Sequence, residues 1–282
     1  MKISEIKKEA KQNLKGKWGK TILITFIFEL ITIALGFVLG LTSNTFMYLP
    51  IYLAYLVLIV PISYGLMNSF VNLYDGKEVK AFDFLDFGFK NFKRSWSISL
   101  NILLKLLPLI AVMIVLIIAT IAINYFSPSH EFNILVYIVL IALNIALLIQ
   151  SFSYVASIFI SFKYPNLTGK QCVELSSKSM NGKRGKYFGL ILSFIGWILL
   201  GFLITLIFIF ILAFIITMLF SIGNSLTTNS LIVITALISL ITIIITYIFC
   251  FILYMFLTPY IQFSQIVFFD KELHDTIKER ID

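Results

Sequence analysis

The chain alternates between long apolar stretches and short polar ones, and the apolar stretches set its class. Runs of about 18 or more apolar residues are long enough to cross a bilayer as a helix. Six such stretches are predicted to be membrane spans, at residues 20–41, 47–73, 97–123, 132–162, 187–220 and 230–258. The last three are longer than a crossing needs, so we expect them to tilt or to protrude from the membrane.

The polar segments predict three further helices, at residues 1–18, 79–96 and 168–181. In the first, the residues on one face are Ile3, Ile6, Ala10 and Leu14; in the second they are Phe82, Leu85, Phe89, Phe92 and Trp96. Amphipathic helices of this kind lie in the membrane interface with the apolar face toward lipid; a solvated connector is the alternative. The third begins with a capping box from Thr168 to Gln171 and has a poorer apolar face, which favours packing on protein.

The predicted fold class is therefore all-α: a polytopic bundle of six transmembrane helices with amphipathic helices on the cytoplasmic side. Residues 1–282 are expected to form a single membrane domain, with hairpins at 20–73, 97–162 and 187–270, the last including the C-terminal tail. A basic and aromatic segment precedes each hairpin, which suggests three copies of one unit about an axis normal to the membrane. The usual gathering of Lys, Trp and Tyr at interfaces explains the same pattern, and both explanations stay open.

Charge then gives an orientation. Only 13% of the residues are charged, against about a quarter in soluble domains. All 22 Lys and Arg lie in residues 1–20, 74–105, 163–186 and 271–282, while the loops near 42–49, 124–131 and 221–229 carry none. Because basic loops stay inside, we expect both termini in the cytoplasm. The same pattern accounts for the net charge of +8 without a nucleic-acid partner, and it makes anionic lipid head groups the expected partners.

The first span is too long for a signal peptide, so no cleaved leader is expected.

Polar residues inside the spans supply the candidate site, which consists of Glu29, Lys105, Asn101 and Gln150. Glu29 lies roughly 16 Å beyond Trp18 at the helical rise, and Lys105 lies at a comparable depth. Intramembrane carboxylates often mark functional sites. Three interpretations remain open: an ion pair with Lys105, a protonated Glu29 bonded to Asn101 or Gln150, or a hydrophilic path. Lys105 could also extend toward the cytoplasm.

Small residues and aromatic residues mark the remaining expected contacts. Small residues let membrane helices approach closely, so helix packing is predicted at Gly36, Gly40, Gly189, Ser193 and Gly196. Aromatic residues beside basic segments are predicted to be interfacial anchors, namely Trp18, Trp96 and Tyr187.

Catalytic chemistry is not indicated. The histidines, His130 and His274, are predicted on opposite sides of the membrane, and no C-x-x-C pair or phosphate-binding loop occurs. We therefore expect no catalytic residue, no metal and no cofactor.

Several short strings resemble one family. They are Leu14-Lys15-Gly16-Lys17-Trp18-Gly19, Met180-Asn181-Gly182, Leu192-Ser193-Phe194-Ile195-Gly196-Trp197, Pro259-Tyr260 and Phe268-Phe269-Asp270. Together they resemble the bacterial integral membrane family named domain of unknown function 975, over nearly the whole chain, with Phe269 in place of an expected Tyr. The resemblance implies a bacterial plasma-membrane protein and transfers no activity.

Three functions follow as hypotheses. The first is an accessory or scaffold protein of the bacterial cytoplasmic membrane that acts on lipids or on another membrane protein. The second is a small-solute or ion transporter or channel with a polar path near Glu29. The third, a membrane enzyme, lacks any supporting motif.

Overall fold

The computed structural model describes residues 1–41, 45–126, 130–222 and 228–280, and the regular structure in these ranges is α-helical. The short loops predicted near 42–49, 124–131 and 221–229 fall partly outside the described residues. The helices are α1 (Ile3–Leu14), α2 (Trp18–Gly40), α3 (Thr45–Tyr74), α4 (Asp83–Lys90), α5 (Phe92–Phe126), α6 (His130–Ser151), α7 (Ser157–Lys163), α8 (Gly169–Ser179), α9 (Arg184–Leu192), α10 (Ile195–Ile222), α11 (Thr228–Glu272) and α12 (His274–Lys278).

Six stretches in the described part of the chain are long and apolar enough to cross a membrane. They are Trp18–Gly40, Phe46–Tyr74, Phe92–Tyr125, Ile134–Ser151, Arg184–Met218 and Thr235–Glu272. The predicted class, an all-α protein with six membrane spans, is confirmed.

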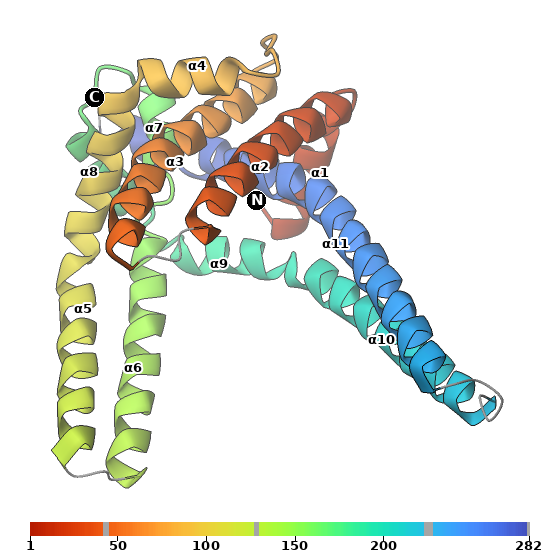
Figure 1. Ribbon diagram of the computed structural model, residues 1–282. Helices are drawn as coiled ribbons and strands as arrows, with labels where there is room; N and C mark the ends of the chain where they lie inside the picture. The colour runs from red at the N-terminus through yellow and green to blue at the C-terminus, as the bar shows by residue number, and fades with distance from the viewer. Residues whose placement is uncertain (42–44, 127–129, 223–227, 281–282) are drawn as a thin grey trace.

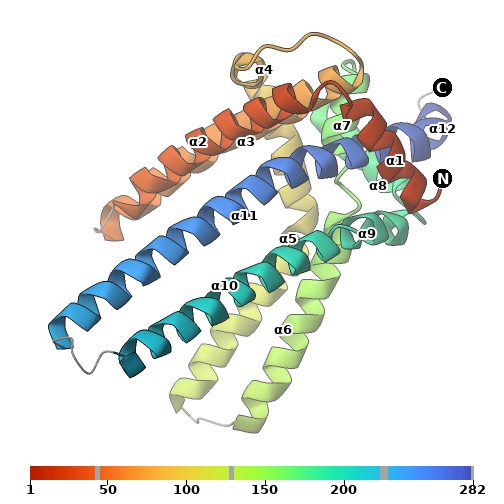
Figure 2. The ribbon, with the colours of Figure 1, turned by 90° about the vertical axis from the view of Figure 1, so that its right-hand side faces the viewer.

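The spans form three hairpins that diverge from one end of the molecule. Figures 1 and 2 show α2–α3, α5–α6 and α10–α11 leaving a common region in different directions, and both termini lie at this region in Figure 2. We call this region the hub: it comprises α1, α4, α7, α8, α9 and α12 with the adjoining ends of the spans. At most 11% of the residues in the most apolar part of any span are buried in protein. The hairpins are therefore joined mainly at the hub.

The hub holds a core of large aromatic side chains. The ring of Phe70 on α3 meets Phe263 on α11 with centroids 6.2 Å apart, and Tyr187 on α9 stacks on Phe269 at 5.8 Å. Burying one large apolar side chain contributes roughly 1.5–3 kcal/mol. The fully buried aromatic side chains of the described residues include Phe70 of α3, Phe84 of α4, Phe194 between α9 and α10, and Phe263, Phe268 and Phe269 of α11.

The N-terminal helix α1 packs on protein, so the prediction that its apolar face meets lipid is wrong. Ile6, Ala10 and Leu14 are fully buried, and α1 contacts α11 and α9. The surface they cover exists because α11 continues through Pro259 to Glu272, well past the predicted end of the span at residue 258. The residues after Pro259 are apolar enough to gain from the hub core, and this burial outweighs the hydrogen bond that proline removes.

Helix α4 crosses α3 with the two backbones in direct contact. A Cβ atom on Gly65 would lie 1.8 Å from the carbonyl oxygen of Phe84, and one on Gly88 would lie 2.2 Å from that of Pro61.

The predicted helix over 79–96 is divided, because Asn91 ends α4 by donating its side-chain amide to the Phe87 carbonyl at 2.9 Å. Phe82 is exposed, and the predicted contact of its helix face with lipid stays a prediction.

Two predicted spans are interrupted near the hub. The helix predicted over 132–162 ends at Ser151 and resumes as α7 at Ser157, and the one predicted over 187–220 breaks between α9 and α10. At the second break, the Ser193 hydroxyl donates to the Leu190 carbonyl at 2.6 Å, and Phe194 is only 1% exposed. Serine side chains that bond to the backbone bend helices, and the buried Phe194 fixes this bend to the hub.

The order of elements matches the unit predicted from the sequence. A hub helix, α1, α4 or α8, precedes each pair of spans, and α8 begins with the predicted capping box between Thr168 and Gln171. A true internal repeat stays a prediction.

The contact between α3 and α4 gives a stability test. Gly65→Ala and Gly88→Ala should each destabilise the purified protein by about 1–3 kcal/mol, because a methyl group would displace backbone rather than a flexible side chain. Thermal unfolding in detergent measures the effect. The matched control is Gly36→Ala, since its added Cβ would meet no atom of another helix within 4 Å in the part of the chain that the structure describes. Equal stability of all three variants would contradict the contact.

Candidate functional site

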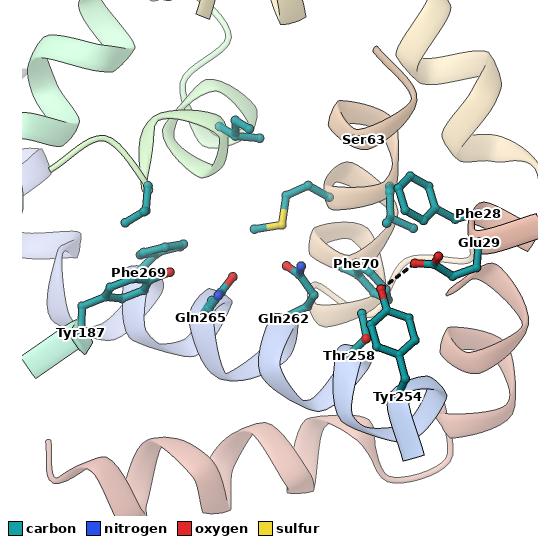
Figure 3. Close-up of a pocket in the computed structure, with 14 residues that line it drawn as sticks. Phe28, Glu29, Ser63, Phe70, Tyr187, Tyr254, Thr258, Gln262, Gln265 and Phe269 are labelled. Carbon is teal, nitrogen blue, oxygen red and sulfur yellow. Dashed lines mark hydrogen bonds between the residues drawn. The ribbon is translucent and has the colours of Figure 1, made fainter. Parts of the chain in front are cut away.

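A cavity of about 360 Å³ lies where the three hairpins diverge from the hub. Figure 3 shows the side chains that line it, with α11 forming one wall. The first hairpin contributes residues of α2 and α3, the third contributes residues of α11, and the hub contributes Val155, Ile158 of α7 and Tyr187 of α9. Ligand sites commonly occupy such junctions between packed units.

The cavity has an apolar side and a polar side. The polar side chains of α11 follow a helical spacing, so Tyr254, Thr258, Gln262 and Gln265 lie on one face of that helix. Glu29 on α2 and Ser63 on α3 add to them. The apolar lining consists of Phe28, Leu66, Met67, Phe70, Val155, Ile158 and Phe269.

Glu29 joins the first and third hairpins through hydrogen bonds. The Tyr254 hydroxyl donates to Glu29 Oε1 at 2.6 Å, as the dashed line in Figure 3 shows, and the Thr32 hydroxyl lies 3.2 Å from Oε2. Glu29 is thus a bridge between hairpins as well as part of the cavity wall.

The other three residues of the predicted polar site lie elsewhere. Lys105 is exposed on α5 and makes no ion pair with any described carboxylate. Asn101 donates to the Ser97 carbonyl at 2.7 Å within its own helix, and Gln150 lies 3.5 Å from the Tyr154 hydroxyl. The ion pair between Glu29 and Lys105, one of the three open interpretations, does not form among the described residues, because α5 leaves the hub in a different direction from α2 (Figure 1).

Most of the residues expected to pack helices face open space. Among the described residues, a Cβ placed on Gly36, Gly40 or Gly196 would meet no atom of another helix within 4 Å. A Cβ on Gly189 would lie 3.0 Å from Ile3 Cδ1, so this glycine does lie against α1. The Ser193 carbonyl accepts a hydrogen bond from Lys7 Nζ at 3.0 Å.

The three expected interfacial anchors have different surroundings. Tyr187 is 4% exposed within the hub core, so its prediction as an interfacial anchor is wrong. Its neighbours Phe268 and Phe269 belong to α11, whose helical extension the sequence did not reveal. Trp18 packs against Phe256 with ring centroids 6.1 Å apart. Trp96 is partly buried and its Nε1 lies 3.4 Å from the Val57 carbonyl oxygen.

The lining of the cavity is suited to bind a polar group. One carboxylate and several neutral amides and hydroxyls line it, which suits a cationic or hydrogen-bonding group. The described residues contain no group of three or more His, Cys, Asp and Glu that could hold a metal ion. Cys172 is buried in the hub away from this lining, and its burial raises the pKa of the thiol, so it is a poor nucleophile.

The polar face of α11 is not among the features predicted from the sequence. Thr258, Gln262 and Gln265 continue the spacing that begins at Tyr254, and this spacing was the available signal. The predicted end of the sixth span at residue 258 leaves Gln262 and Gln265 outside the helix, so the sequence alone does not place them on this face.

A double-mutant cycle tests the bridge. Glu29→Leu and Tyr254→Phe should each destabilise the protein by roughly 0.5–1.5 kcal/mol, the range for hydrogen bonds between membrane helices. The double variant should lose little more than one single variant, because both remove the same interaction. Thermal unfolding in detergent provides the measurement.

Lys105→Met is the control for this cycle. It should change stability little by itself, and its effect should add to that of Glu29→Leu, because the two side chains do not interact. Coupling between Glu29 and Lys105, or strict additivity between Glu29 and Tyr254, would contradict the observed geometry.

Comparison with known proteins identifies a family but no activity. No curated protein and no solved structure matches the chain. The sequence model of the family described as "Protein of unknown function (DUF975)" matches residues 1–274, which is nearly the whole chain. The chain therefore belongs to the DUF975 family, as the short strings in its sequence predicted.

Proposed function

We propose that this protein is an accessory or scaffold protein of the bacterial cytoplasmic membrane, which holds a lipid or protein partner with its hairpins and hub. The divergence of the three hairpins is the observation that carries this proposal. Their apolar surfaces are largely unoccupied by the protein itself, so lipid or another membrane protein must cover them. A multi-pass protein with this shape presents more surface to partners than a closed bundle does.

The same shape argues against a continuous conduit. A transport path needs protein on all sides of its polar residues through the thickness of the membrane. Here the polar side chains of the cavity extend from the hub only as far as Glu29, at the middle of α2, and the outer parts of the hairpins lie apart (Figures 1 and 2). The absence of a recognised catalytic motif in the sequence favours the scaffold over an enzyme.

The basic residues support an orientation with the hub in the cytoplasm. The helices α1, α4, α8 and α12 all carry lysine and lie at the hub, where both termini are also found. Lys and Arg concentrate on the cytoplasmic side of membrane proteins. Anionic head groups of the inner leaflet would then face this surface.

A small-solute or ion transporter is the second candidate, and one observation favours it. The Glu29 carboxylate lies in the wall of a cavity that also offers two glutamine amides. Such groups could bind a cation or a proton during an exchange between conformations.

Cysteine labelling in intact cells tests the orientation. In a chain without Cys172 and Cys250, a cysteine at Thr45 should react with an impermeant maleimide added outside. Cysteines at Gln12 and Lys90 should react only after the membrane is opened, because they belong to the hub. External labelling at Lys90 would reverse the proposed orientation.

Photo-crosslinking together with a flux assay tests the function. A photoreactive residue at Leu104 or Ile243, which are 63% and 64% exposed, should crosslink in native membranes to the same partner protein. Phe263, fully buried, is the control position and should give no such product. Proteoliposomes of the wild-type protein should show no ion or proton uptake.

The outcomes separate the candidates. Crosslinks to lipid alone, with no flux, would leave lipid as the partner of the scaffold. A flux that disappears in Glu29→Gln would overturn the scaffold proposal in favour of transport.

A further inference from the structure

A second cavity, of about 620 Å³, lies between the third hairpin and the N-terminal helix. We call it the α10–α11 groove. Helix α1 closes its hub end with Lys7 and Lys11, and Trp18 of α2 lies beside them. The apolar walls consist of Leu200, Ile204, Phe249, Leu253, Phe256 and Leu257.

The groove has the dimensions of an acyl chain in one leaflet. From Tyr260 back to Phe249 it follows α11 for roughly 16 Å at the helical rise. One leaflet contributes about half of the roughly 30 Å hydrocarbon core. Its walls are open to the surroundings, since Leu200 is 44% and Phe256 52% exposed. A flexible apolar chain can therefore enter from the side.

The hub end of the groove is basic and holds one lysine in a fixed place. Lys7 Nζ donates to the Ser193 carbonyl at 3.0 Å and lies 4.4 Å from the centroid of the Phe194 ring. The Tyr260 ring lies next to that of Phe194, with the two centroids 5.1 Å apart, and its centroid is 5.9 Å from Lys7 Nζ. Lys11 follows one helical turn later and is exposed. The two ammonium groups thus share one face of α1.

No opposite charge balances these lysines within the described residues. None of the residues that line the groove is acidic, and neither lysine forms an ion pair with a described carboxylate. Burial lowers the pKa of Lys7, because its ammonium group has lost water without gaining a negative neighbour. An anion beside Lys7 would compensate for that loss.

Tryptophans complete the arrangement at the level where head group and acyl chain meet. Trp197 on α10 and Trp18 on α2 both line the groove next to the basic end. Tryptophan is enriched at this depth in membrane proteins because its ring is apolar and its N–H is polar. The string from Leu192 to Trp197 therefore supplies the carbonyl and the ring that hold Lys7, and one wall of the groove.

We propose that the α10–α11 groove is a binding site for an anionic phospholipid, with the phosphate at Lys7 and Lys11 and an acyl chain along α10 and α11. Charge complementarity at one end and apolar length along the rest select this ligand over a zwitterionic lipid or a soluble phosphate. The inference deepens the proposed function, since it names one lipid site on the scaffold. The lipid site requires only that a membrane surrounds the protein. The scaffold proposal can therefore fail while the lipid site holds, and the lipid site can fail while the scaffold proposal holds.

Fluorescence quenching by brominated lipid tests the site. Trp96→Phe leaves Trp18 and Trp197, which both line the groove, as the only tryptophans. The full-length variant is placed in phosphatidylcholine nanodiscs that contain a small fraction of brominated phosphatidylglycerol or of brominated phosphatidylcholine. The anionic lipid should quench at much lower fractions, and soluble glycerol phosphate should not relieve the quenching.

Lysine variants locate the head group. Lys11→Gln should weaken the effect of the anionic lipid roughly fivefold, and Lys7→Gln/Lys11→Gln should remove most of the preference over phosphatidylcholine. Lys7→Arg/Lys11→Arg should retain it. The charge-matched control is Lys8→Gln/Lys170→Gln, two exposed lysines that do not line the groove, and it should behave like the parent.

Each contrary result overturns the proposal. Equal quenching by both lipids would show an apolar groove without head-group selection. Relief by glycerol phosphate alone would show a site for soluble phosphate. Unchanged quenching in Lys11→Gln would remove the proposed role of the basic end, and since Lys11 is exposed, that variant should fold normally.

Discussion

The burial of aromatic side chains in the hub is the interaction on which the rest of the structure depends. Within a bilayer, apolar spans gain little from leaving lipid for one another, because the hydrocarbon is as apolar as leucine. At the hub the situation differs, since Phe70, Phe263 and Phe269 remove apolar surface from contact with the aqueous side. The hub therefore decides the direction of each hairpin, and the spans beyond it follow without a closed bundle.

Both candidate sites are consequences of that divergence. The cavity at Glu29 forms where helices have begun to separate but are still held by the Tyr254 hydrogen bond. The α10–α11 groove forms at the side of the third hairpin, where α1 covers only the hub end and leaves the apolar walls open. One site is central and carries a carboxylate, and the other is lateral and carries ammonium groups. Ligands of opposite charge are thus expected to find different places on the same hub.

Contacts near the hub are tight while contacts farther out are few, and this contrast explains which small residues matter. Gly65 and Gly88 allow two backbones to touch, whereas Gly36 and Gly40 touch nothing that the structure describes. A small residue permits close approach but does not cause it. The cause lies in the neighbouring large residues, such as Phe84, which gain from burial when α3 and α4 come together. The spacing of glycines in the sequence therefore does not predict which helices gain from burying such large residues.

The sequence by itself determined the class, the six spans and the segregation of charge, because each depends on composition within a short stretch. It also located Glu29, since a carboxylate in an apolar run stands out without knowledge of its neighbours. Only the tertiary structure decided which helices meet. The tertiary structure separates Lys105 from Glu29 and buries Tyr187. It also extends α11, so that Gln262 and Gln265 line the cavity and α1 has a surface to pack on. These outcomes depend on the sum of many contacts between distant segments, and local patterns of polarity do not record that sum.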